Sequence, residues 1–252
     1  MSRYLILLFF LAALTAASHA SDGRYEISEH CAVLGCFPGD SPGLPVTITQ
    51  PGSYVLTSNL TTSDVDQTLI QISTHNVSVD LNGFSLVGPV SCTGSPNECS
   101  ASGSGNGITL SACSSQPCRG LHIRNGTIRG MGRSALGLYY GKGVILENLS
   151  LIENGSYGLH TWTGTGFGTL EGLARNLVVT RNGGEGFHLS GFGGRFLVTD
   201  SVFTDNTGMA QRQGSCSNNR FVREEAASNA QVTNCYSFGT NFCRSSAGNS
   251  SC

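Results

Sequence analysis

The chain has 252 residues, of which only 12% are charged, and its formal net charge at pH 7 is −2. Proteins that bind nucleic acid through their charge carry a basic surface, so this balance excludes electrostatic nucleic-acid binding as the main function. Glycine is abundant, at 34 residues, and together with frequent Asn, Ser and Thr it favours one all-β domain with many turns.

Residues 1–20 have the pattern of a secretory signal peptide. Arg3 provides the positive start, an almost unbroken apolar run extends from Leu5 to Leu14, and small residues, Ser18 and Ala20, flank the predicted cleavage site. The apolar run is shorter than the about 20 residues that a membrane-spanning helix needs. We therefore expect a secreted or periplasmic protein with no membrane span in its mature chain. An uncleaved membrane anchor is the alternative.

The ten cysteines all follow this segment, and an even number behind a signal peptide predicts disulfides. Three pairs are close in the chain and are expected to form local bridges: Cys31–Cys36, Cys92–Cys99 and Cys113–Cys118. The last four, Cys216, Cys235, Cys243 and Cys252, are also expected to be bonded, but their spacing leaves the connectivity open. Zinc binding is the alternative, and the absence of any CxxC pair speaks against it.

An internal repeat is the strongest signal in the sequence. An asparagine or aspartate recurs between two apolar stretches, and its positions are Asn59, Asn82, Asn125, Asn148, Asn176, Asp200 and Asn234. The shortest steps are 23 and 24 residues, and the two longest contain insertions rich in Cys, Ser and Gly. From Asn125 onward, apolar residues recur two positions before the markers and, up to Asp200, three positions after them. A third short strand follows, as in Ala135–Leu138 and Gly186–Leu189.

Each repeat therefore holds three short strands, and the alternation within them gives each strand one buried face. Stacked coil on coil, about 4.8 Å apart, such strands enclose a continuous apolar column. This predicts a parallel β-helix with three sheets, in which asparagines at equivalent bends form side-chain ladders.

Charges next to the markers alternate in sign from coil to coil. Arg124, Glu147 and Arg175 precede successive markers, and Glu153 and Arg181 lie five residues after two of them. Neighbouring coils would place opposite charges side by side. We expect structural ion pairs, each worth about 0 to 1 kcal/mol when exposed.

The stretches Pro51–Thr57 and Val77–Gly88 resemble the opening coils of the right-handed parallel β-helix superfamily, which includes pectate-lyase-like proteins. The resemblance covers residues 46–241. It implies the fold but not the activity, because the superfamily includes polysaccharide lyases, hydrolases, epimerases and adhesins. Residues 21–45 are expected to form an irregular N-terminal cap and residues 242–252 a disulfide-tethered tail, since open solenoid ends expose core and strand edges.

The repeat alignment also predicts a candidate site. Twelve residues after three successive markers come His160, His188 and Arg212, which should stack in one outward column. Fourteen residues after Asn125, Asn148 and Asn176 come Tyr139, Trp162 and Ser190. Aromatic rings cover the apolar faces of sugars, while His and Arg bind hydroxyls and carboxylates. An exposed patch of this kind is typical of a polysaccharide-binding surface.

These residues would suit β-elimination in an acidic polysaccharide. Arg212 would neutralise the carboxylate, and His160 or His188, with a pKa near neutral, would take the proton. Tyr139 or Lys142 would assist, although Lys142 is expected in a solvated turn. Glu185 is the only nearby acid without an evident ladder partner and joins Tyr139 and Trp162 as a predicted substrate-binding residue. Hydrolysis needs two facing carboxylates and is therefore less favoured.

No metal or cofactor is expected, because the sequence contains no acidic cluster and no nucleotide-binding motif. Two function classes follow from the sequence. The first is a secreted protein that binds, and by β-elimination cleaves, an extracellular acidic polysaccharide. The second is a non-catalytic structural, adhesive or envelope protein. The His/Arg column favours the first, and the single lysine and the short solenoid favour the second.

Overall fold

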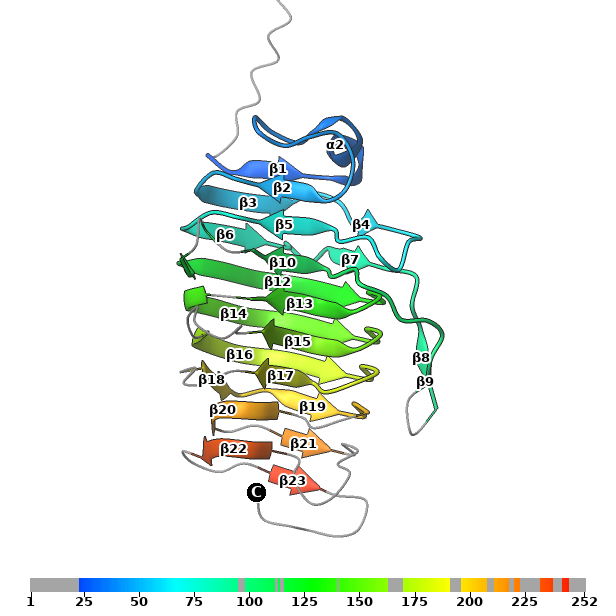
Figure 1. The fold of residues 1–252 in the computed structure, drawn as a ribbon, viewed down its shortest axis with the longest axis vertical. Helices are drawn as coiled ribbons and strands as arrows, with labels where there is room; N and C mark the ends of the chain where they lie inside the picture. The colour runs from blue at the N-terminus through cyan, green and yellow to red at the C-terminus, as the bar shows by residue number, and fades with distance from the viewer. Residues whose placement is uncertain are drawn as a thin grey trace, which may run out of the picture.

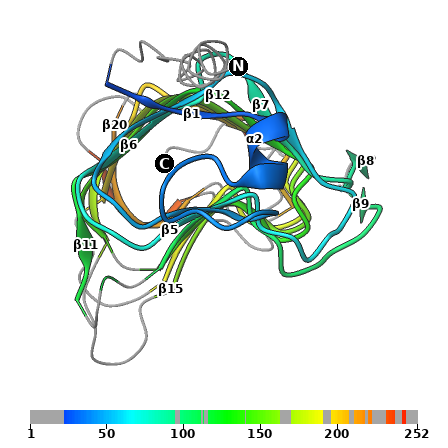
Figure 2. The same cartoon turned by 90° about the horizontal axis from the view of Figure 1, so that it is seen from above.

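A computed structural model shows the chain as a stack of parallel β-coils (Figure 1). It describes residues 23–94, 98–111, 113, 116–139, 141–162, 170–190, 196–207, 211–217, 220–222, 232–237 and 242–244. The predicted signal peptide lies outside these residues. Viewed from above, the coils lie over one another around a common interior (Figure 2). The prediction of an all-β parallel solenoid is confirmed.

Strands of successive coils pair in parallel and make three sheets. The first sheet runs through β1 (Tyr25–Ile27), β3 (Gly52–Leu56), β6 (Val77–Asp80), β12 (Leu121–Arg129), β14 (Gly141–Ile152), β16 (Glu171–Thr180), β18 (Phe196–Thr199), β20 (Gln211–Ser217) and β22 (Val232–Ser237), with β11 (Cys118–Arg119) beside β14.

The second sheet begins with β4 (Leu60–Thr61) and β7 (Ser85–Val87), continues through the second halves of β12, β14 and β16, and ends with β19 (Val202–Thr204), β21 (Arg220–Val222) and β23 (Phe242–Arg244). The third sheet contains β2 (Val46–Ile48), β5 (Ile70–Ile72), β10 (Ile108–Leu110), β13 (Ser134–Leu138), β15 (Tyr157–Trp162), β17 (Phe187–Ser190) and the start of β20.

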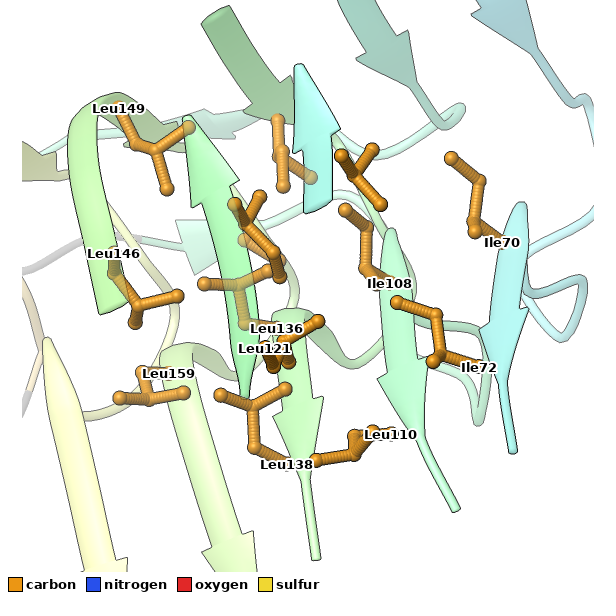
Figure 3. Packing of buried hydrophobic residues seen from close by; sticks show 14 of the residues in the cluster. Ile70, Ile72, Ile108, Leu110, Leu121, Leu136, Leu138, Leu146, Leu149 and Leu159 are labelled. Carbon is orange, nitrogen blue, oxygen red and sulfur yellow. The ribbon is translucent and has the colours of Figure 1, made fainter. Parts of the chain in front are cut away.

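The interior is a column of apolar side chains, and a strand contributes one or more of them on each coil. In the third sheet Ile70, Ile108, Leu136, Leu159 and Phe187 are paired in register, and each is fully buried. Figure 3 shows this packing between β5, β10, β13 and β15. Burying one such side chain contributes roughly 1.5–3 kcal/mol, so the stacked rows supply the main driving force for coil-on-coil assembly.

The repeat markers lie at sharp bends between the first and second sheets. Asn125, Asn148 and Asn176 have left-handed backbones, with φ of 60°, 54° and 54°, a conformation that asparagine tolerates better than most residues. The Asn148 amide donates to Asn125 Oδ1 at 3.1 Å, and the Asn176 amide donates to Asn148 Oδ1 at 3.3 Å. The predicted asparagine ladder is therefore present at these bends.

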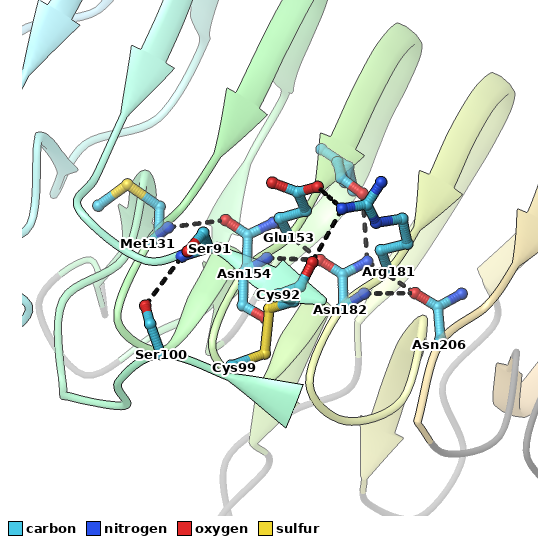
Figure 4. Close-up of a disulfide and its surroundings, with 11 residues drawn as sticks. Ser91, Cys92, Cys99, Ser100, Met131, Glu153, Asn154, Arg181, Asn182 and Asn206 are labelled. Carbon is cyan, nitrogen blue, oxygen red and sulfur yellow. Dashed lines mark hydrogen bonds and ion pairs between the residues drawn. A yellow bond between two sulfur atoms is a disulfide. The ribbon is translucent and has the colours of Figure 1, made fainter. Parts of the chain in front are cut away.

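A second ladder, six residues after the markers, is buried. Asn154 and Asn182 are fully buried and Asn206 is 1% exposed. The amide nitrogens of Asn154 and Asn182 donate to the next Oδ1 at 2.8 Å, and each of the three Oδ1 atoms also accepts a backbone N–H of the coil before it (Figure 4). These side chains satisfy backbone groups that the turns would otherwise leave without partners.

The predicted charge ladder is present only in part. Glu147 pairs with Arg175, and Glu153 pairs with Arg181. The hydrogen bond from Arg175, assisted by one from His122, lowers the pKa of Glu147 below its ordinary value, with burial acting in the opposite direction. Arg124 instead bonds to Asp80 at 3.1 Å on the preceding coil. The sequence did not indicate Asp80 as the partner of Arg124, because a 43-residue step separates the markers Asn82 and Asn125.

Three predicted disulfides are confirmed: Cys31–Cys36, Cys92–Cys99 and Cys113–Cys118. The second closes an antiparallel hairpin of β8 (Cys92–Thr93) and β9 (Glu98–Cys99). This hairpin lies beside the buried ladder, where Arg181 Nη2 donates to the Cys92 carbonyl at 2.8 Å (Figure 4). The pairing of Cys216, Cys235, Cys243 and Cys252 lies outside what the structure describes.

Both ends of the described chain contain regular structure within the segments expected to be irregular. Strand β1 pairs with β3, and α2 (Glu29–Leu34) follows it, with the Ser28 side chain accepting the Cys31 N–H at the helix N-terminus. Strand β23, within the expected tail, continues the second sheet. In the described part of the chain, no helix is long and apolar enough to span a membrane.

The buried ladder gives a testable stability prediction. In N182A, the Asn154 N–H and the Leu151 carbonyl lose their bonds to Asn182, so we expect the free energy of unfolding to fall by at least about 2 kcal/mol. Asn148 is exposed and glycine tolerates its left-handed backbone, so N148G should cost under about 1 kcal/mol. Urea denaturation measures both variants. Equal losses would contradict the structural role assigned to the buried ladder.

Candidate functional site

The third sheet places the predicted site residues in one row. Gly137 on β13 pairs with His160 on β15, His160 with His188 on β17, and His188 with Arg212 on β20. The preceding residues in β15 and β17, Leu159 and Phe187, are buried in the core, so alternation directs the two histidine side chains to the outside of the coil.

His160 is 7% exposed, although the sequence predicted an exposed position. The Tyr157 ring stacks on the imidazole with centroids 4.8 Å apart and an interplanar angle of 14°. The Tyr139 ring meets it edge-on at 6.5 Å, and the His188 ring lies at 5.3 Å. Tyr157 stands three residues before His160 and folds back over it, which strand alternation alone does not predict.

This packing changes the acid–base character of His160. Burial, and then the positive charges of Arg133 and His188, lower the pKa of His160 from its ordinary 6.5 to about 4, with Glu185 acting in the opposite direction. Its Nδ1 is shielded from solvent and has no hydrogen-bond partner. The expectation of a near-neutral pKa is therefore wrong for His160, and the imidazole is uncharged at neutral pH.

His188 has a different environment. Its Nδ1 lies 2.5 Å from Glu185 Oε2, and the two side chains are 17% and 13% exposed. Both of these atoms are shielded from solvent, and their close approach is not aligned as a hydrogen bond. The sequence found no partner for Glu185, whereas the structure pairs it with the histidine three residues further on.

Two residues that the sequence analysis missed belong to the same cluster. Tyr157 contacts both imidazoles, at 4.8 Å and 5.0 Å between ring centroids. Arg133 lies in the turn before β13, and its Nη1 is 3.4 Å from the Tyr139 hydroxyl. Tyr157 and Glu185 each stand three residues before a histidine of the row. This shared offset is the sequence signal that could have indicated Tyr157. We call the six residues Arg133, Tyr139, Tyr157, His160, Glu185 and His188 the histidine face.

For two of the remaining predicted residues, the structure describes only the backbone. Trp162 pairs in register with Ser190, and Arg212 with His188, but their side chains lie outside what the structure describes. Lys142 was expected in a solvated turn, which is wrong: it belongs to β14 in the first sheet, and its Nζ lies 3.7 Å from Glu171 Oε1. Because the third sheet carries the histidine face, Lys142 is not part of this cluster.

Fold and cluster together define a parallel β-helix protein with an aromatic and imidazole face on its third sheet. Comparisons with family models, curated proteins and solved structures give no match to this chain. Within the described residues, no group of three or more His, Cys, Asp or Glu side chains is arranged to hold a metal ion.

The lowered pKa of His160 predicts a pH-dependent stability. Between about pH 6.5 and 4 the unfolded chain binds a proton at this residue that the folded chain does not bind, so the free energy of unfolding falls as the pH falls through this window. H160Q does not titrate and should show a flatter dependence. Urea denaturation across the window measures it, with H30Q, at an exposed position of α2, as the matched control. Parallel curves for wild type and H160Q would contradict the prediction.

Proposed function

We propose that this protein is secreted and binds an extracellular polysaccharide along the histidine face. The observation that carries the proposal is the in-register row of His160, His188 and Arg212 on successive coils, bordered by two tyrosine rings. Tyrosine rings cover the apolar faces of sugars, while imidazole and guanidinium groups bind their polar substituents.

The spacing of the coils supports an extended ligand. Parallel coils repeat about every 4.8 Å, which is close to the rise of one sugar unit along a chain. A polysaccharide parallel to the axis of the solenoid would therefore meet an equivalent position on each coil. Three disulfides among the described residues are compatible with an extracellular location.

The charges of the site favour an acidic polysaccharide. Arg133 belongs to the histidine face, and Arg212 follows His188 in the row. Because His160 is uncharged at neutral pH, these arginines are the cations that would bind a carboxylate. The reaction that suits this set is β-elimination, as in the pectate-lyase-like proteins that the opening coils resemble. A non-catalytic adhesive or envelope protein is the alternative, and it predicts binding without cleavage.

A glycan-array screen followed by calorimetry tests the proposal. We expect an acidic polysaccharide to bind, and binding to weaken as salt rises. Y157A should raise the Kd about 3- to 10-fold, because one ring contact is worth about 0.5–1.5 kcal/mol. The control is Y25A, at a 37% exposed tyrosine near the N-terminal end. The proposal fails if no polysaccharide binds, or if Y25A weakens binding as much as Y157A.

A further inference from the structure

We propose that Glu185 is a positioning residue that orients His188 as the general base of the histidine face. This inference rests on the proposed function, since the base would act on the bound polysaccharide. It goes beyond that function because it divides the two histidines of the row into one reacting group and one packing group.

The geometry of the Glu185–His188 pair supports the assignment. Glu185 Oε2 lies 2.5 Å from His188 Nδ1, and solvent reaches neither atom. In a neutral imidazole only one ring nitrogen carries a proton, and a carboxylate beside Nδ1 selects the tautomer protonated there. The lone pair then lies on Nε2, the nitrogen left for a ligand. The contact is not aligned as a hydrogen bond in this structure, and catalytic hydrogen bonds are often poorly aligned before substrate binds.

His160 has no such arrangement. Its ring is stacked against Tyr157, and only 7% of the residue is exposed. A base must reach the proton that it removes. His188 is less buried than His160 and is the better placed of the two histidines. His160 instead packs against both the Tyr157 and the His188 rings and helps to hold the His188 ring in place.

The reaction follows from this arrangement. His188 Nε2 takes the C5 proton of a uronate unit, and the electron pair of the C5–H bond forms the C4=C5 double bond. The C4–O4 bond breaks, its electron pair goes to O4, and O4 takes a proton from water. His188 then returns its proton to the solvent, so no oxidant or other co-reactant is needed. Arg133 is the described cation of the histidine face and would neutralise the carboxylate.

Two measurements test the inference, one of them without any polysaccharide. Nitrogen-15 NMR of the imidazole rings should show His188 protonated at Nδ1 in the wild-type protein and at Nε2 in E185A, with E185D restoring the wild-type signal. If Glu185 only packed against His188, E185A would not change the tautomer of His188. His160 is the matched control ring, and its signals should keep their tautomer in E185A. A wild-type His188 protonated at Nε2, or a tautomer unchanged in E185A, would overturn the positioning role.

The second measurement follows unsaturated products in the ultraviolet, with polygalacturonate and alginate as the probes. H188A and H188Q should lower the elimination rate at least about 100-fold, much more than they weaken binding of the polymer, whereas H30Q, at an exposed position of α2, should retain the rate. Wild-type protein that binds a probe but forms no product would overturn the base role and leave the proposed function intact. If neither these probes nor any acidic glycan binds, the proposed function itself fails and the base role fails with it.

Discussion

The hydrogen bond between asparagine side chains on neighbouring coils is the interaction on which the rest of this structure depends. Asn154, Asn182 and Asn206 are buried and linked in series, and each binds a backbone group of an adjacent coil as well as the next side chain. A slip of one residue between coils would exchange the inner and outer faces of every strand. A buried amide ladder allows no such slip, because its donors and acceptors would lose their partners.

The histidine face is a consequence of this fixed register. Residues far apart in the chain share the outer row of the third sheet only because each coil begins and bends at the same place. Within that row, local packing gives the two histidines different chemical properties. Burial under Tyr157 keeps His160 uncharged, whereas a carboxylate contacts His188. A solenoid can thus carry a different residue or environment at the same outer position of each coil. Its core does not change when the outer surface varies in this way.

The sequence predicted the features that repeat. Spacing and alternation indicated the coils, the three sheets, the local disulfides and the row that contains His160 and His188. It did not predict contacts that depend on how a side chain folds within a coil, such as Tyr157 over His160 or Glu185 against His188. The burial of His160, which lowers its pKa, was also hidden, since alternation states which side of a strand a residue occupies and not what covers it. Asp80 was missed as the partner of Arg124 because an insertion separates the two in the chain.

The central claim is that successive coils of the third sheet form one extended site for a polysaccharide. A crystal structure of the protein with an acidic oligosaccharide chosen by the binding screen tests this most directly. The account predicts consecutive sugar units along the row from Gly137 to Arg212, about one unit per coil, with a ring against Tyr157 and one hydrogen near His188 Nε2. An oligosaccharide bound on the first or second sheet, or crossing the coils at one point only, would contradict it.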